Sequence, residues 1–361
     1  MRTGTARLPL HGGAAPAWLF SRMTKLAREI VSLMVIEFGP QEVLRKLSDP
    51  YWFQALGCVL GFDWHSSGLT TTTTGAIKEG IKDLQSELGL FSCGGKGSTS
   101  RRTPDEIRQN ADRYSLRIDP EKLVYASRMA AKVDSSAVQD GYQIYHHAFF
   151  FDREGNWAVV QQGMNESSGM ARRYHWLSSE VESFVVEPHT AVESEGKTGD
   201  VVLNMVAREA EQNRLVCAAV ASENPDKAIR EIQRINELQL PKRHEISAQD
   251  ISPQYLRKIL TKTYERQPQN FEQLLGVEGV GAKTIRALAL ISDLVYGAPI
   301  SRRDPAAYSF AHGGKDGTPY PVDRRGYDRT IEIVKKAVER AKLGNTATVQ
   351  AIKTLARFYE F

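Results

Sequence analysis

The stretch Leu274-Leu275-Gly276-Val277-Glu278-Gly279-Val280-Gly281-Ala282-Lys283-Thr284 decides how the C-terminal part of the chain is interpreted. An apolar helical turn leads into Gly-Val-Gly, and a second helix is predicted immediately afterwards. Gly279 and Gly281 can adopt φ > 0 and leave backbone N–H groups uncovered. Those groups would lie at a helix N-terminus, where the dipole and the unpaired donors favour an anion. The alternative is a glycine C-cap followed by an ordinary helix.

This stretch resembles the helix-hairpin-helix motif, which grips a DNA phosphate through backbone amides without reading base sequence. The resemblance implies double-stranded DNA as the partner. The predicted DNA-binding residues are Gly279, Val280, Gly281, Lys283, Thr284, Arg302 and Arg303.

The distribution of charge agrees with a polyanionic partner. Residues 241–361 contain 20 Lys and Arg against 13 Asp and Glu, a net charge of +7, whereas residues 1–240 carry a net charge of −3. Positive charge is therefore concentrated in the segment that contains the predicted hairpin, which favours nucleic acid.

The composition is that of an ordinary soluble protein. Of 361 residues, 41% are hydrophobic and 25% are charged. A chain of this length can bury a full hydrophobic core. The three cysteines, Cys58, Cys93 and Cys217, form no Cys-x-x-Cys pair, so neither a disulfide framework nor a cysteine zinc site is indicated. No signal peptide and no membrane-spanning run is recognised. We therefore expect a cytoplasmic protein without membrane association.

The pattern of apolar residues predicts an α+β fold in three parts. We expect a mainly helical region at 1–135, a small antiparallel β region with helices at 136–240, and an all-α DNA-binding domain at 241–361. Two closing helices are expected at 328–342 and 347–358.

Four local predictions refine this division. Residues 142–152 and 157–162 are rich in aromatic and β-branched residues and should form a β-hairpin around 153–156. Residues 181–186 could add a strand. The run of five threonines at 70–74 is β-prone, and the Gly-rich basic stretch 93–102 is predicted to be a loop.

Histidine is concentrated in the central region. Imidazole and carboxylate groups together can bind a divalent metal or act as a general base on a phosphodiester. Arginine complements the negative charge of the phosphate. Because neighbouring strand residues face opposite ways, only one of His146 and His147 can join a given site. The candidate catalytic residues are Asp140, His146, His147, Gln162, Arg172, Arg173, His175, Glu187 and His189. We expect His146 or His147, with His175, Glu187 and His189, to bind Mg²⁺ or Mn²⁺ in one solvent-reachable pocket. The alternative is a polar sheet face with hydrogen-bonded histidines.

The C-terminal part also resembles the helix-hairpin-helix DNA glycosylase superfamily. The resemblance rests on Gly279-Val280-Gly281-Ala282-Lys283-Thr284, Tyr296-Gly297-Ala298-Pro299 and Pro321-Val322-Asp323. It implies that Lys283 forms a Schiff base with the sugar and that Asp323 assists base excision. Some twenty extra residues separate the two positions, in contrast to the family pattern.

Over nearly its whole length the chain resembles a bacterial and archaeal family described as a domain of unknown function (seven-sixty-three). The motifs that carry the resemblance are Arg2-Thr3-Gly4, His11-Gly12-Gly13, Tyr145-His146-His147, Trp157-Ala158-Val159-Val160-Gln161-Gln162-Gly163-Met164, Arg172-Arg173-Tyr174-His175-Trp176 and Glu187-Pro188-His189. This family implies no particular activity.

The sequence therefore predicts a DNA-processing enzyme of the repair type. A metal-dependent nuclease is the first interpretation. A base-excision glycosylase with lyase activity and a non-catalytic DNA-binding factor are the alternatives.

Overall fold

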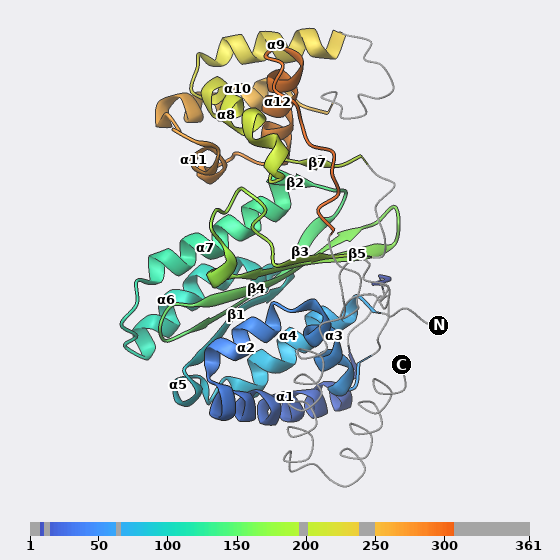
Figure 1. Ribbon diagram of the computed structural model, residues 1–361, viewed down its shortest axis with the longest axis vertical. Helices are drawn as coiled ribbons and strands as arrows, with labels where there is room; N and C mark the ends of the chain where they lie inside the picture. Colours follow the sequence, from blue (N-terminus) through green and yellow to red (C-terminus); the bar gives the residue numbers. More distant parts are fainter. Residues whose placement is uncertain (1–7, 11–14, 63–65, 195–200, 238–249, 307–361) are drawn as a thin grey trace.

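The computed structural model describes residues 8–10, 15–62, 66–194, 201–237 and 250–306. The motifs at 2–4 and 11–13, Asp323 and the two closing helices lie outside these ranges. Within them the fold is α+β, as predicted, with an antiparallel sheet in the middle and helices at both ends (Figure 1).

The central sheet is five-stranded, with the order β1-β3-β4-β5-β6 and antiparallel pairing throughout. Its strands are β1 (Leu90–Lys96), β3 (Gln143–Asp152), β4 (Trp157–Asn165), β5 (Met170–Leu177) and β6 (Ala191–Glu193). A separate pair is formed by β2 (Val138–Gln139) and β7 (Leu203–Asn204). The predicted hairpin is confirmed as β3–β4. Its turn is closed by Asp152, whose Oδ1 accepts from the backbone N–H groups of Glu154 and Asn156 at 2.9 Å each.

The N-terminal helices cover one face of the sheet (Figure 1). They are α1 (Ala17–Phe38), α2 (Pro40–Leu47), α3 (Pro50–Val59), α4 (Gly68–Ile81) and α5 (Gln85–Leu88). Their apolar sides enclose Ala148, Phe150 and Val160 of the sheet in one buried cluster. Gly39, at φ 82°, ends α1 and allows α2 to start at once.

The opposite face of the sheet is covered by α6 (Thr103–Arg113) and α7 (Pro120–Lys132). A one-turn π-helix, η2 (Val133–Ala137), continues α7 and leads into β2. The remaining short helical segments are 3₁₀ helices, η1 (Gly97–Arg102), η3 (Ser178–Glu180) and η4 (Arg208–Ala210). The apolar core of this face includes Phe149 and Val124 and continues without a break to Leu288 in the C-terminal helices.

The C-terminal helical unit lies beyond α7 (top of Figure 1). It consists of α8 (Glu211–Ala221), α9 (Pro225–Glu237), α10 (Pro253–Arg266), α11 (Phe271–Gly276) and α12 (Ala282–Leu294). Because α8 packs against α11 and α12, this unit begins about thirty residues before the boundary expected at 240/241. Likewise, the region 1–135 contributes β1 to the sheet, so it is not an independent helical part.

Three local predictions were wrong. Residues 70–74 are helical and belong to α4, where the buried Thr74 hydroxyl donates to the Thr70 carbonyl at 2.8 Å. Thr70 and Thr73 are also buried, whereas Thr71 and Thr72 are half-buried. Residues 93–102 are not a loop, because they form the end of β1 followed by η1. Residues 181–186 are not a strand. None of the described helices is long and apolar enough to cross a membrane.

Candidate functional site

Two helices joined by a short glycine-containing turn lie where the helix-hairpin-helix motif was predicted. Helix α11 ends at Gly276, a five-residue turn follows, and α12 begins at Ala282. Gly279 has φ +89°, and a Cβ there would lie 2.5 Å from Ile259 Cδ1. Gly281 is the N-cap residue of α12, and no described side chain caps the helix. The turn therefore leaves the first amides of α12 open to a ligand.

The carbonyl groups of the turn are bound by the body of the protein. Lys132 Nζ, at the end of α7, donates to the Val280 carbonyl, and Gln139 Nε2 donates to the Ala282 carbonyl at 2.9 Å. Tyr255 donates its hydroxyl to the Gly279 carbonyl at 3.3 Å. These bonds fix the orientation of the turn relative to α7 and the sheet.

The side chains of the predicted DNA-binding residues divide into two groups. Val280 and Thr284 are buried, so their side chains cannot meet DNA. Lys283 is exposed, but its Nζ donates to the Asp250 carbonyl at 3.0 Å and lies 3.4 Å from the Asp250 carboxylate. An ion pair this exposed is weak in water, so a phosphate could replace it. Arg302 and Arg303 are exposed on the segment after α12.

The prediction of one histidine pocket is wrong, because strand alternation sends its members to opposite faces of the sheet. His146, Gln162, Arg173 and His175 face the N-terminal helices. The second set faces α7 and consists of His147, Arg172, Asp140 and His189. Glu187 joins neither, since it lies at the surface with Arg303 and Arg208.

The first set belongs to a buried group of side chains that we call the α4-face cluster. Its members are Gln54, Thr70, Thr74, His146, Gln162, Arg173, His175 and Glu193.

Two bonds fix the tautomer of His146 in this cluster. The Thr74 hydroxyl donates to the Thr70 carbonyl, so His146 Nε2, 3.0 Å from that oxygen, must carry the hydrogen. His146 Nδ1 then has no partner among the described residues. Burial, followed by repulsion from His147, Lys96 and Arg173, lowers the pKa of His146 to about 3.

Charge in the α4-face cluster centres on Arg173 and Glu193. Arg173 Nη1 lies 2.9 Å from Glu193 Oε2, and Arg173 also donates to Thr70 and Gln54 at 2.9 Å each. Burial raises the pKa of Glu193 to about 8, although Arg173 opposes the shift. His175 donates from Nδ1 to the Leu47 carbonyl at 3.0 Å, and its pKa is well below the usual value because of burial.

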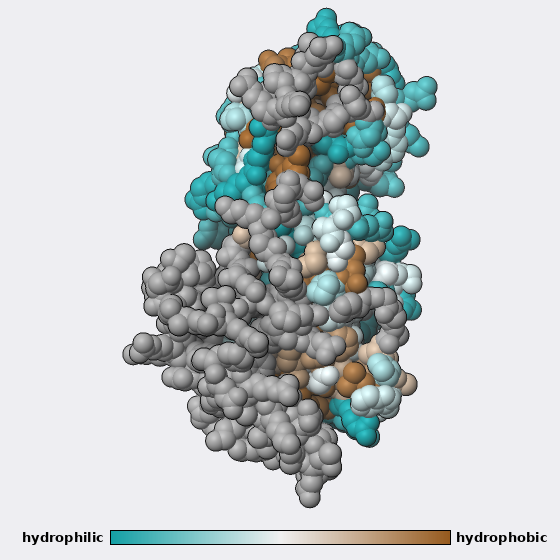
Figure 2. All heavy atoms as spheres, turned by 90° about the vertical axis from the view of Figure 1, so that its right-hand side faces the viewer, coloured by the Kyte–Doolittle hydropathy of each residue, from teal (hydrophilic) through white to brown (hydrophobic). Residues whose placement is uncertain are grey.

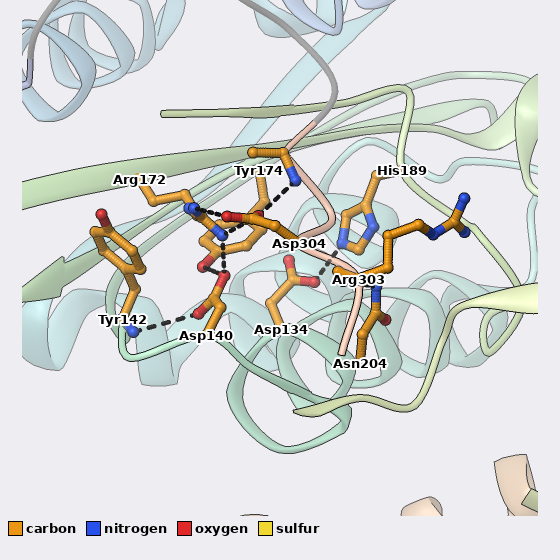
Figure 3. Close-up of polar contacts among 10 residues, drawn as sticks. Asp134, Asp140, Tyr142, Arg172, Tyr174, His189, Asn204, Arg303 and Asp304 are labelled. Carbon is orange, nitrogen blue, oxygen red and sulfur yellow. Dashed lines mark hydrogen bonds and ion pairs between the residues drawn. The ribbon is translucent and has the colours of Figure 1, made fainter. Parts of the chain in front are cut away.

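On the other face lies a second group of side chains, which we call the α7-face cluster (Figure 3). It is centred on Arg172 and includes Asp140, Tyr142, Tyr174 and Asp304. The Arg172 guanidinium donates to Asp140 at 2.8 Å and to both Asp304 oxygens at 2.9 and 3.1 Å. Tyr174 donates its hydroxyl to Asp140 at 2.8 Å, and the Tyr142 ring lies 4.6 Å from the guanidinium carbon. Burial raises the pKa of Asp140, while Arg172 opposes that shift. The cluster joins the segment after α12 to the sheet.

A second network on this face surrounds Asp134 of η2. Asp134 accepts from His189 Nε2 and Gln161 Nε2 at 2.5 Å each and from Trp176 Nε1 at 3.0 Å. Gln161 Oε1 in turn accepts from His147 Nδ1 at 2.9 Å, and His147 Nε2 lies 2.9 Å from the Ser127 hydroxyl. Both ring nitrogens of His147 are therefore engaged, which is the satisfied polar arrangement considered as the alternative.

No group of three or more His, Cys, Asp or Glu side chains that could hold a metal ion is found in the described ranges. Three carboxylates in the clusters, Asp134, Glu193 and Asp304, were missed by the sequence analysis. Each stands alone in its local sequence, and only the tertiary fold brings it to its partners. The alternation Ala191-Val192-Glu193 could have placed Glu193 on one sheet face, but not beside Arg173.

The fold and these sites define a mixed α+β protein with a C-terminal helical unit attached to a sheet that buries charge on both faces. A family model described as "Protein of unknown function (DUF763)" matches residues 4–322, so the chain belongs to this family. No curated protein and no solved structure matches the chain.

Proposed function

We propose that the protein binds duplex DNA without sequence preference through the α11–α12 turn and hydrolyses its phosphodiester bonds. The observation that carries the binding proposal is the N-terminus of α12 at Gly281, which no side chain of the described residues caps. Backbone amides and the helix dipole there suit a phosphate oxygen. They read no base, so binding should not depend on sequence.

The surroundings of the turn support the same partner. A Cβ at Gly281 would meet nothing closer than the Gly279 carbonyl oxygen, at 4.0 Å, so the protein leaves this position open. Among the coloured residues at the top of Figure 2, hydrophilic ones predominate beside a few hydrophobic patches. Residues 241–361 carry the net charge of +7, which favours a polyanion.

We assign hydrolysis of the phosphodiester to the α7 face of the sheet, where the Asp134–His189 pair lies nearest the surface, because imidazole and carboxylate groups move protons. Dependence on Mg²⁺ or Mn²⁺ belongs to this proposal, and a chelator tests it. The glycosylase and lyase alternative depends on Lys283. Borohydride trapping on abasic DNA would favour it, and binding without any reaction would favour a non-catalytic factor.

The binding proposal is tested by a pair of matched variants. Gly281→Ala adds a methyl group beside the open amides, whereas Gly276→Ala adds one at an exposed helix end, 3.8 Å from Met129 Cε. Fluorescence anisotropy with two unrelated duplexes should show similar affinities that fall steeply with salt. Gly281→Ala should bind more weakly on both duplexes, and Gly276→Ala should bind like the wild type. Equal affinities of the two variants would remove the turn as the binding site.

A further inference from the structure

The Asp134–His189 pair has the geometry of an acid–base group. Asp134 is completely buried, and its carboxylate accepts hydrogen bonds from three donors, His189, Gln161 and Trp176. Three donors on one carboxylate leave it no freedom to turn. Because an ionised carboxylate only accepts, Nε2 of His189 must carry the hydrogen.

The other nitrogen of His189 is thereby left as a base. In the neutral imidazole with its hydrogen on Nε2, Nδ1 holds a lone pair, and no hydrogen bond to Nδ1 is found among the described residues. The ring is held by Trp176, whose ring centroid lies 4.6 Å away in an edge-on arrangement. The His189 side chain keeps 6% of its surface exposed, while His146 and His175 are enclosed between the sheet and the helices. His189 is thus held by Asp134 and Trp176, and a small part of its side chain lies at the surface (Figure 3).

The π-helix η2 connects this pair to the DNA-binding turn. Lys132, directly before η2, and Gln139, two residues after it, donate to the carbonyls of Val280 and Ala282. Asp134 lies within η2 itself. Single π turns are frequent at functional sites. Side chains on either side of η2 bind the α11–α12 turn, and Asp134 within η2 binds His189. The turn and His189 are therefore fixed relative to each other.

A partly exposed arginine lies near the pair. Arg303 is 56% exposed, and its guanidinium binds Glu187, two residues before His189, and lies 3.3 Å from the Glu209 carboxylate. The main chain of Arg303 is held by Asn204, whose Nδ2 donates to its carbonyl at 2.9 Å. A phosphate group that displaces the Glu187 and Glu209 carboxylates would meet a guanidinium suited to its charge.

We infer that His189 is a catalytic general base for hydrolysis of DNA and that Asp134 is its positioning residue, an inference that rests on the proposed DNA binding. His189 Nδ1 takes a proton from water, and the water oxygen forms a bond to phosphorus. One P–O ester bond breaks, and the departing oxygen takes a proton from solvent. Each cut consumes one water and needs no other co-reactant.

The test measures binding and cutting separately on the full chain. Binding is followed by anisotropy, and cutting by gel with plasmid and labelled duplex in Mg²⁺ or Mn²⁺. His189→Ala should lower the cutting rate at saturating protein by on the order of 10²-fold, with Kd unchanged. Imidazole added to His189→Ala should restore part of the rate. Asp112→Asn, on the exposed side of α6, is the control and should cut like the wild type.

Asp134→Asn tests the positioning role. It should lower the cutting rate and leave Kd unchanged, and the double variant with His189→Ala should be no slower than His189→Ala alone. A merely structural Asp134 would give additive losses instead. If Asp134→Asn fails to fold, imidazole rescue of His189→Ala decides the question alone. Absence of rescue, full activity in His189→Ala, or a wild type that binds without cutting would overturn the inference and leave the binding proposal standing. Absence of binding would overturn both.

Discussion

Replacing Arg172 by methionine should destabilise the protein strongly. Arg172 and Asp140 are both completely buried at 2.8 Å, so the variant leaves the Asp140 carboxylate in the core with only Tyr174 and the Tyr142 N–H as donors. Removing one partner of a buried ion pair costs about 3–5 kcal/mol. Arg303→Met is the matched control, because the Arg303–Glu187 pair is 56% and 38% exposed. Such a pair contributes at most about 1 kcal/mol.

Urea unfolding followed by tryptophan fluorescence measures the free energy of unfolding of Arg172→Met and of Arg303→Met. The loss in Arg172→Met should become smaller as the pH is lowered from 8 into the acid range, since burial raises the pKa of Asp140 and protonation removes the unpaired charge. Adding Asp140→Asn should recover part of the loss, because it removes the unpaired charge. Equal losses in Arg172→Met and Arg303→Met would refute the assignment of a buried ion pair.

Four further predictions concern single residues. Gly279→Ala should lower the free energy of unfolding by on the order of 1–3 kcal/mol, since φ is +89° and Ile259 blocks the Cβ; an unchanged urea midpoint would contradict this. The raised pKa of Glu193, about 8 against 4.5, means that stability falls as pH rises through this window, and Glu193→Gln should remove that fall. The lowered pKa of His146, about 3 against 6.5, means that stability falls as pH drops through that window. His146→Gln should therefore reduce the fall in the free energy of unfolding between these pH values. Lys283→Ala should weaken DNA binding by roughly 1 kcal/mol while cutting persists at saturating protein, and loss of all cutting would indicate a nucleophile instead.

Local sequence determined much of the fold. The β3–β4 hairpin was predictable because Asp152, Gly155 and Asn156 supply the turn chemistry between two apolar runs. The α11–α12 turn was predictable for the same reason, since Gly279 stands where φ is positive. The threonine run misled the prediction because β-branched residues favour strands when nothing else acts. In α4 their burial against the sheet outweighs that preference.

The candidate sites were less predictable, because each depends on contacts between distant segments. Strand alternation correctly separated His146 from His147. It could not show that His189, which lies in no strand, would reach Asp134, fifty-five residues earlier in the chain. Nor could it show that Asp304 would bind Arg172. Composition identified the histidine, arginine and carboxylate residues that the two clusters contain. Only the tertiary fold assigns them to the two sides of the sheet.

The apolar core that runs from the sheet into the C-terminal helices has a consequence for how the molecule unfolds. Phe149, Val124 and Leu288 belong to one buried cluster, so these parts should lose their structure in a single cooperative transition. A ligand held at the α11–α12 turn would then protect the distant sheet by mass action. At a free ligand concentration one hundred times Kd, the gain is about 2.7 kcal/mol. Slower amide hydrogen exchange in β3 would therefore report occupancy of a turn that β3 does not touch.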